Sequence, residues 1–251
     1  MDTCPKCNYT PKDSDSMTIE GICPACGIAY SKWIEKQNVY DDENTRSNDE
    51  SLVIKPSYSF YQKLISHLTQ VPESTDAAVF YGRIALFVVF LIWGIFFMIG
   101  GIDWDSVGGS FLHSINLPFH EFGHVLFSIF GRFMAILGGS LFQIMVPFIF
   151  TFAFCWQPKD NFAGAITLWW CGQNFIDISP YIADAPYRAI PLVGGLGEEA
   201  HDWGNLLTTL NLVDSATTIA WCSFFIGIVI MLFAYFWAGT VLLLQKQRLS
   251  A

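Results

Sequence analysis

Residues 84–102 read IALFVVFLIWGIFFMIGGI and contain no charged side chain over 19 positions. An apolar stretch of this length is sufficient to cross the hydrocarbon core of a bilayer as a single helix. Arg83 precedes the stretch, and Asp103 and Asp105 follow it. Because the cytoplasmic flanks of membrane helices carry an excess of Lys and Arg, this asymmetry predicts a cytoplasmic N-terminus.

The rest of the chain is also rich in apolar residues. Of its 251 residues, 53% are hydrophobic and only 14% are charged, whereas charged residues make up about a quarter of a soluble domain. We therefore expect an all-α polytopic membrane bundle of about five to six membrane segments over residues 79–251. The net charge of −9 argues against a nucleic-acid partner, and the polar N-terminus argues against a signal peptide.

Further apolar runs are expected to supply the remaining membrane segments: residues 107–130, 133–156, 162–185 and 216–244. Gly138, Gly139 and Pro147 permit close approach of another helix, a kink or a break. Lys246 and Arg248 follow the last run and indicate a cytoplasmic C-terminus. Five crossings from a cytoplasmic N-terminus would end on the other side. Either the run at 133–156 is a re-entrant hairpin, or the C-terminus lies on the other side despite its positive charges.

Residues 117–127 read LPFHEFGHVLF, an H-E-x-x-H motif in an almost wholly apolar run. On a helix His120 and His124 share a face, so both imidazoles can bind one metal ion, with Glu121 beside its open position. A chance match of three residues is the alternative interpretation. Two histidines and a glutamate are costly in a membrane segment unless they serve a site. We interpret the motif as a zinc site with Glu121 as general base.

The four N-terminal cysteines have the spacing C-x2-C-x15-C-x2-C, with a C-P-x-C sequence in each pair: Cys4, Cys7, Cys23 and Cys26. This spacing is typical of a structural zinc site, and disulfides are the alternative. We expect residues 1–35 to form a zinc ribbon in which the metal replaces a hydrophobic core. Zinc thiolates favour a reducing compartment, which agrees with a cytoplasmic N-terminus. Such a ribbon more often holds a protein partner than performs chemistry.

Residues 36–78 connect the ribbon to the membrane segments. The run at 41–50 is polar and acidic, which is typical of a flexible linker. Between positions 56 and 72 the apolar residues recur at helical spacing: Tyr58, Tyr61, Leu64, Ile65 and Leu68. This pattern predicts an amphipathic helix lying on the membrane, and a docking helix for the ribbon is the alternative.

Four polar residues of the run 162–185 fall on one face of a helix, provided that Pro180 does not break it: Asn174, Asp177, Tyr181 and Asp184. A polar stripe on an apolar helix points toward a site or a water-filled cavity, and hydrogen bonding between helices is the alternative. His201 and Asp202, in the loop that follows, form one further group of potential ligands. A solvated loop histidine is the alternative there.

Asp177, Asp184 and His201 compete for the role of third zinc ligand. If the helices at 107–130 and 162–185 run parallel, equal fractions along them lie at equal depth, and Asp177 then matches the histidine pair. Asp184 would lie roughly 10 Å further along. His201, whose ring Asp202 could orient, would require a loop that enters the membrane. We therefore select Asp177.

These residues resemble those of site-2-protease-like intramembrane zinc metallopeptidases, in particular a divergent bacterial branch with a zinc ribbon in front. The resemblance rests on HEFGH at 120–124 and on the polar stripe at 174–184, and it covers about residues 107–185. In that family a later helix carries an asparagine and a Leu-Asp-Gly, whose aspartate is the third zinc ligand. Here residues 181–185 read YIADA, so the family pattern leaves the third ligand open.

The resemblance implies hydrolysis of a membrane-protein or peptide substrate in a bacterial inner membrane, with the ribbon in the cytoplasm. It implies a catalytic zinc besides the structural one, Glu121 as general base and Asn174 as a hydrogen-bond donor to the oxyanion. Two other classes of function remain. One is a non-catalytic zinc-site scaffold or regulator, and the other is a metal transporter or sensor whose polar stripe lines an ion path.

Overall fold

The computed structural model describes residues 3–4, 6–10, 12, 21–32, 36, 59–156, 159–195 and 197–249. The chain divides into two compact units, Met1–Ser59 and Phe60–Ala251. The linker expected at 41–50 and Tyr58 of the amphipathic pattern lie outside the described residues. The second unit is helical throughout its described part, so the expectation of an all-α fold is confirmed there.

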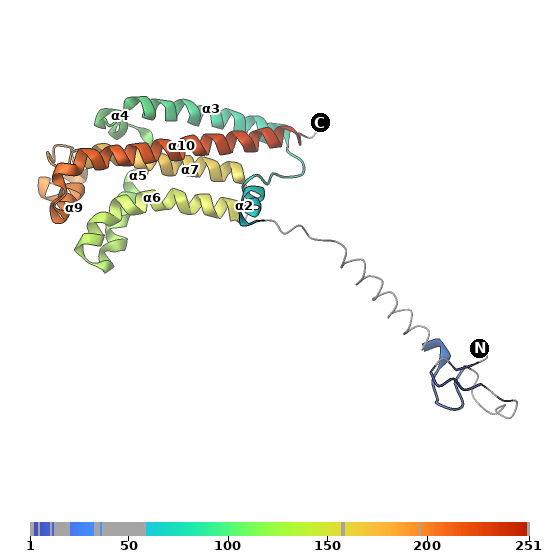
Figure 1. Ribbon diagram of the computed structural model, residues 1–251. Coiled ribbons are helices and arrows are strands. Elements are labelled where there is room, and N and C mark those ends of the chain that lie inside the picture. The colour runs from blue at the N-terminus through green and yellow to red at the C-terminus, as the bar shows by residue number, and fades with distance from the viewer. Residues whose placement is uncertain are drawn as a thin grey trace. The chain divides into compact units, whose positions relative to one another are not determined.

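The described residues of the second unit form nine α-helices. They are α2 (Phe60–Leu68), α3 (Ala77–Gly100), α4 (Trp104–Gly108), α5 (Phe111–Phe127), α6 (Arg132–Trp156), α7 (Asn161–Asp177), α8 (Ser179–Ala183), α9 (Asp202–Leu210) and α10 (Ala216–Lys246). Figure 1 shows how the longer ones lie side by side. Pro147 lies inside α6 without ending it. Pro180 follows a one-residue interruption at Ile178, where the expected single helix divides into α7 and α8.

Among the described residues, three segments are long and apolar enough to cross a membrane: Ala77–Gly100, Arg132–Trp156 and Val213–Lys246. α5 and α7 have 17 residues each and lie below that length. The expected count of five to six segments is therefore not confirmed. The first span begins earlier than the sequence suggested, because Asp76 caps the helix by accepting hydrogen bonds from the backbone N–H groups of Ala78 and Val79.

The start of α3 and the end of α10 lie at the same end of the bundle, beside α2 (Figure 1). Phe80 of α3, Phe162 of α7 and Leu242 of α10 pack in one apolar cluster there. Arg248 donates hydrogen bonds to the carbonyl oxygens of Val71 and Pro72, which fixes the C-terminal segment near the start of α3. The positive charges near the start of α3 and at the end of α10 thus share one end, which we call the α2 end.

α5 stays at the opposite end of the bundle. It begins beside the end of α7, where His113 contacts Asp177, and it finishes against the first turns of α6, where His124 contacts the Ala135 carbonyl. Figure 1 shows α4, α9 and the connection from α5 to α6 at this end. The second apolar run, at 107–130, contains α5 and therefore does not reach the α2 end. The third run, at 133–156, forms the continuous helix α6.

α2 is held at its end of the bundle through backbone carbonyl groups. Asn161 donates hydrogen bonds to the carbonyls of His67 and Gln70, and Trp237 donates one to the carbonyl of Leu68. The apolar side chains of α2 remain exposed: Phe60, Tyr61, Leu64 and Ile65. An exposed apolar face on a short docked helix is compatible with the interfacial position that its sequence predicts.

Candidate metal centre

α5 and α6 cross at glycines, which brings the histidine pair against the backbone of α6. A Cβ on Gly138 would lie 2.6 Å from the carbonyl oxygen of Gly123. A Cβ on Gly139 would lie 2.6 Å from Nε2 of His124 and 2.7 Å from Nε2 of His120. Of the two possibilities left open for the glycines, close approach is the one realised. The space that a side chain would occupy at position 139 holds the two imidazoles.

The outer ring nitrogen of each histidine contacts an acceptor. Nδ1 of His120 lies 3.0 Å from Oε1 of Gln143, and Nδ1 of His124 lies 2.8 Å from the carbonyl oxygen of Ala135. Since an oxygen acceptor requires a donor, this geometry assigns the proton to Nδ1 in the neutral form of both rings. Each Nε2 then carries a lone pair, which is the form in which a neutral imidazole binds a metal.

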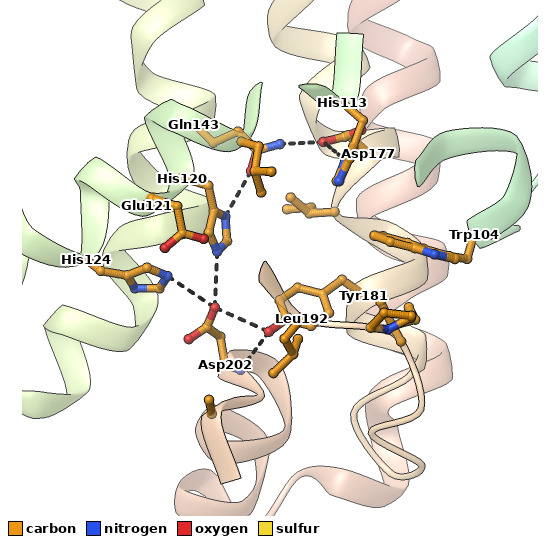
Figure 2. Close-up of a pocket in the computed structure, with 15 residues that line it drawn as sticks. Trp104, His113, His120, Glu121, His124, Gln143, Asp177, Tyr181, Leu192 and Asp202 are labelled. Atoms are coloured by element: carbon orange, nitrogen blue, oxygen red, sulfur yellow. Dashed lines mark hydrogen bonds and ion pairs between the residues drawn. The ribbon is translucent and has the colours of Figure 1, made fainter. Parts of the chain in front are cut away.

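Both Nε2 atoms face the same carboxylate oxygen (Figure 2). Oδ2 of Asp202 lies 3.1 Å from Nε2 of His120 and 3.3 Å from Nε2 of His124. Zinc ligands in tetrahedral geometry, at bond lengths of 2.0–2.1 Å, would be separated by about 3.3 Å. Two lone pairs directed at an anionic oxygen repel it unless a metal ion or a proton lies between them. The donor set and its spacing therefore fit a divalent metal such as zinc.

Asp202 reaches this position because α9 is held in place on both sides. Trp203 of α9 donates a hydrogen bond to Ser140 of α6 at 3.1 Å. His201 precedes α9 and caps it, since its Nδ1 accepts a hydrogen bond from the N–H of Gly204 at 3.0 Å. Tyr181 accepts a hydrogen bond from the backbone N–H of Asp202 at 2.9 Å. These contacts place the first side chain of α9 against the histidine pair.

His201 and Asp184 bind each other, and neither belongs to the converging group. His201 is completely buried, and its Nε2 lies 3.2 Å from Oδ2 of Asp184. Burial lowers the pKa of His201 and outweighs the opposing effect of Asp184, which agrees with a neutral ring. The alternates named from the sequence thus form a structural pair. Asp202, which we had assigned to orienting His201, is the carboxylate that reaches the metal position.

Asp177 does not join the histidine pair either. Its carboxylate is 3% exposed and contacts Gln143 at 2.6 Å and His113 at 3.2 Å. The depth argument that selected it assumed two parallel helices, and α5 does not run alongside α7 in this way. Equal fractions along the two helices therefore do not correspond to equal depth.

A cavity of about 330 Å³ opens beside the converging group. Its polar wall includes Glu121, Tyr181 and His113 (Figure 2). Glu121 forms no hydrogen bond within the described part of the chain, so its carboxylate is available to a molecule in the cavity. The apolar wall is formed by Trp104, Leu117, Ile178, Ile190, Pro191 and Leu192.

The four residues of the polar stripe at 174–184 do not all contact the same group. Asp177 and Tyr181 line the cavity, while Asp184 holds His201. Asn174 does not line the cavity: it is fully buried, and its amide donates a hydrogen bond to the carbonyl of Trp170 within α7. The structure therefore does not bring Asn174 to the site. His113, which the sequence analysis missed, lies seven residues before His120, a spacing that returns to nearly the same helix face.

The N-terminal unit has a second converging group. Sγ of Cys4 lies 3.8 Å from Sγ of Cys26, and Sγ of Cys7 lies 3.7 Å from Sγ of Cys23. Tetrahedral thiolates at a zinc–sulfur distance of about 2.3 Å would lie about 3.8 Å apart. All four cysteines are free, so the alternative of disulfides is not realised. The sulfur atoms fit one structural zinc.

The two cysteine turns have the same backbone geometry. In the first, the N–H of Asn8 donates to the carbonyl of Cys4, and in the second the N–H of Gly27 donates to the carbonyl of Cys23. Asn8 and Gly27 each follow the second cysteine of a pair, with φ of 55° and 69°. Burial alone would raise the pKa of the Cys23 thiol, but backbone N–H groups nearby lower it to about 6, which favours the metal-binding thiolate.

Comparison of the chain with protein-family models, with curated proteins and with solved structures finds no match. The resemblance to site-2-protease-like peptidases therefore rests on the residues of this chain alone.

Proposed function

We propose that this chain is an integral-membrane zinc metallopeptidase, similar in its chemistry to the site-2-protease-like enzymes. His120, His124 and Asp202 hold the catalytic zinc, and Glu121 is the general base. One observation carries the proposal. Two imidazole lone pairs and one carboxylate oxygen converge beside a cavity that also contains an unpaired glutamate. Asp202 replaces Asp177 as the third ligand in this proposal.

The open side of the centre supports catalysis over a structural role. Structural zinc sites are closed by four protein ligands, whereas catalytic sites have three and leave one position for water or substrate. Three protein ligands converge here, and Glu121 is the other carboxylate of the motif that lines the cavity. A scaffold would not need an unpaired carboxylate beside the three converging ligands.

A zinc ion held there would acidify a water molecule and polarise the carbonyl group of a peptide bond. Glu121 accepts a proton from that water at its carboxylate and delivers the proton to the amide nitrogen as the C–N bond breaks. Tyr181 takes the role that the sequence analysis gave to Asn174. Its hydroxyl, 3.4 Å from Oδ2 of Asp202, can donate a hydrogen bond to the carbonyl oxygen as negative charge develops.

The substrate of this proposal is a membrane-associated peptide segment. Three helices are long and apolar enough to span a membrane, which supports a membrane location. α7 lies antiparallel to α6, and in this proposal it is a fourth, shorter pass. An even number of passes brings the start of α3 and the end of α10 to the same side of the membrane. This agrees with the positive charges that both segments carry at the α2 end. The positive-inside rule assigns that end to the cytoplasm, and a bacterial inner membrane with a cytoplasmic zinc ribbon belongs to the same proposal.

Glu121→Gln tests the proposal with Glu73→Gln as matched control, since Glu73 is exposed at the α2 end. Zinc content and hydrolysis of fluorogenic peptides are measured on full-length protein in detergent. Glu121→Gln should keep the zinc of the wild type and lose at least about 100-fold in rate, while the control keeps both. Loss of zinc would contradict the role of Glu121. Zinc without hydrolysis in the wild type would favour the scaffold alternative.

A further inference from the structure

Asp177 is a buried carboxylate with an unusually complete set of donors. It accepts hydrogen bonds from Gln143 of α6 at 2.6 Å, from Asn116 of α5 at 3.2 Å and from Gln173 of α7 at 3.5 Å. His113 of α5 lies 3.2 Å from the same group. A buried carboxylate surrounded by donors from three helices is satisfied without a metal. Its negative charge therefore acts on the neighbouring side chains that donate to it.

The strongest of these contacts fixes the orientation of an amide. A carboxylate only accepts hydrogen bonds, so Gln143 must direct its NH2 group, and not its oxygen, at Asp177. The amide has one donating end and one accepting end. With Nε2 held 2.6 Å from Asp177, Oε1 is left to face Nδ1 of His120, at 3.0 Å.

This orientation decides which nitrogen of His120 can bind a metal. An oxygen opposite Nδ1 requires the proton on Nδ1, which leaves a lone pair on Nε2, the atom that faces Asp202. If the amide turned around, its NH2 group would face Nδ1 and favour the proton on Nε2. That form of His120 cannot act as a ligand through Nε2.

The position of the proton on His124 does not depend on the orientation of a side-chain amide. Its Nδ1 faces the backbone carbonyl of Ala135, an acceptor that cannot exchange its ends. Only His120 relies on a side chain whose two ends have nearly the same shape and opposite hydrogen-bonding character. The carboxylate behind Gln143 removes that ambiguity.

We propose that Asp177 is a positioning residue that sets the metal affinity of the centre through Gln143 and the proton on His120. The inference rests on the metal-binding part of the proposed function and not on hydrolysis. Residues beyond the direct ligands commonly contribute about 10- to 100-fold to metal affinity by fixing ring orientation and tautomer.

Exchanging the two functional groups tests this directly. Asp177→Asn gives position 177 both a donor and an acceptor, so Gln143 is no longer held in one orientation. Gln143→Glu places two carboxylates at a contact of 2.6 Å. In the double variant Asp177→Asn/Gln143→Glu, the new amide donates to the new carboxylate, whose other oxygen accepts the proton of His120 Nδ1. The size of the side chains and the net charge of the pair are restored.

Zinc bound per chain is measured on full-length protein in a series of chelator-buffered free zinc concentrations. The cysteine group is the same in every variant, so it contributes equally. Each single variant should bind zinc at the membrane-domain centre about 10- to 100-fold more weakly, and the double variant should recover to within about threefold of the wild type. Asp105→Asn, an exposed change of the same kind, should leave affinity unchanged.

Two results would overturn the inference: wild-type affinity in Asp177→Asn, or a folded double variant no tighter than the weaker single variant. Nitrogen NMR of labelled histidine in metal-free protein provides a second readout. His120 should carry its proton on Nδ1 in the wild type and in the double variant, and should show both forms in Asp177→Asn. An unaltered His120 signal there contradicts the inference even if the variants differ in stability. A wild type that binds only the cysteine zinc would instead contradict the proposed function.

Discussion

Replacing Gly139 by alanine should empty the membrane-domain metal centre without altering any ligand. A Cβ at this position would lie 2.6 Å from Nε2 of His124 and 2.7 Å from Nε2 of His120. A normal contact between such atoms is about 3.4 Å or more, so the rings or α6 must move by about 0.8 Å. Metal ligands tolerate deviations of only about 0.2 Å. Overpacking of this kind costs about 1–3 kcal/mol, which corresponds to roughly 5- to 150-fold in zinc affinity.

The matched control is Gly239→Ala in α10, because no atom lies within 4 Å of a Cβ built there. Both substitutions place alanine in a long helix, where it is favoured over glycine by up to about 1 kcal/mol. Zinc per chain and thermal unfolding are measured for both variants. Gly139→Ala should lose one of two zinc ions, whereas Gly239→Ala should keep both. Retention of both zinc ions by Gly139→Ala would refute the position assigned to the metal.

Three further predictions concern single residues. Asp202→Ala should lose the membrane-domain zinc while Asp184→Ala retains at least part of it, and the reverse order in a zinc titration would favour Asp184, one of the two alternates named from the sequence. Cys23→Ser should lose only the other zinc, as measured by zinc content with and without a protease cut between the two units. His201→Ala removes the cap of α9 and should lower the free energy of unfolding by about 1 kcal/mol and weaken zinc binding; denaturant unfolding and zinc titration would show no change if His201 were a solvated loop residue.

The parts of the site that could be predicted are those set by local sequence spacing. His120 and His124 lie four residues apart on one helix, and any α-helix through them produces a shared face. The cysteine pairs are likewise joined within short turns whose geometry is repeated at Asn8 and Gly27. In each case the chain segment that brings the ligands together is five residues or shorter, so no knowledge of the tertiary packing was needed.

The proposed third ligand could not be predicted because its position depends on a local helix cap and on two contacts that are distant in sequence. Asp202 reaches the histidines only because Trp203 binds Ser140, His201 caps α9 and Tyr181 holds the backbone of Asp202. The His-Asp pair was recognised in the sequence, but the roles were assigned in the wrong order. The signal that could have corrected this is the capping position itself, since a residue immediately before a helix is turned toward the helix N-terminus.

The two ends of the bundle also bear on the number of times that the chain passes along it. Of the seven Lys and Arg in residues 60–249, five lie in segments that meet at the α2 end, as their elements and contacts show: Lys63, Arg83, Lys159, Lys246 and Arg248. The candidate metal centre lies at the other end, where Asp103 caps α4, Asp105 lies in its first turn, and Glu198 and Glu199 precede α9. Hydropathy detects that α5 is apolar but not that both of its ends lie at the same end of the bundle. A helix that packs its glycine face on α6 can hold a buried site without crossing, and this arrangement leaves both charged flanks on one side.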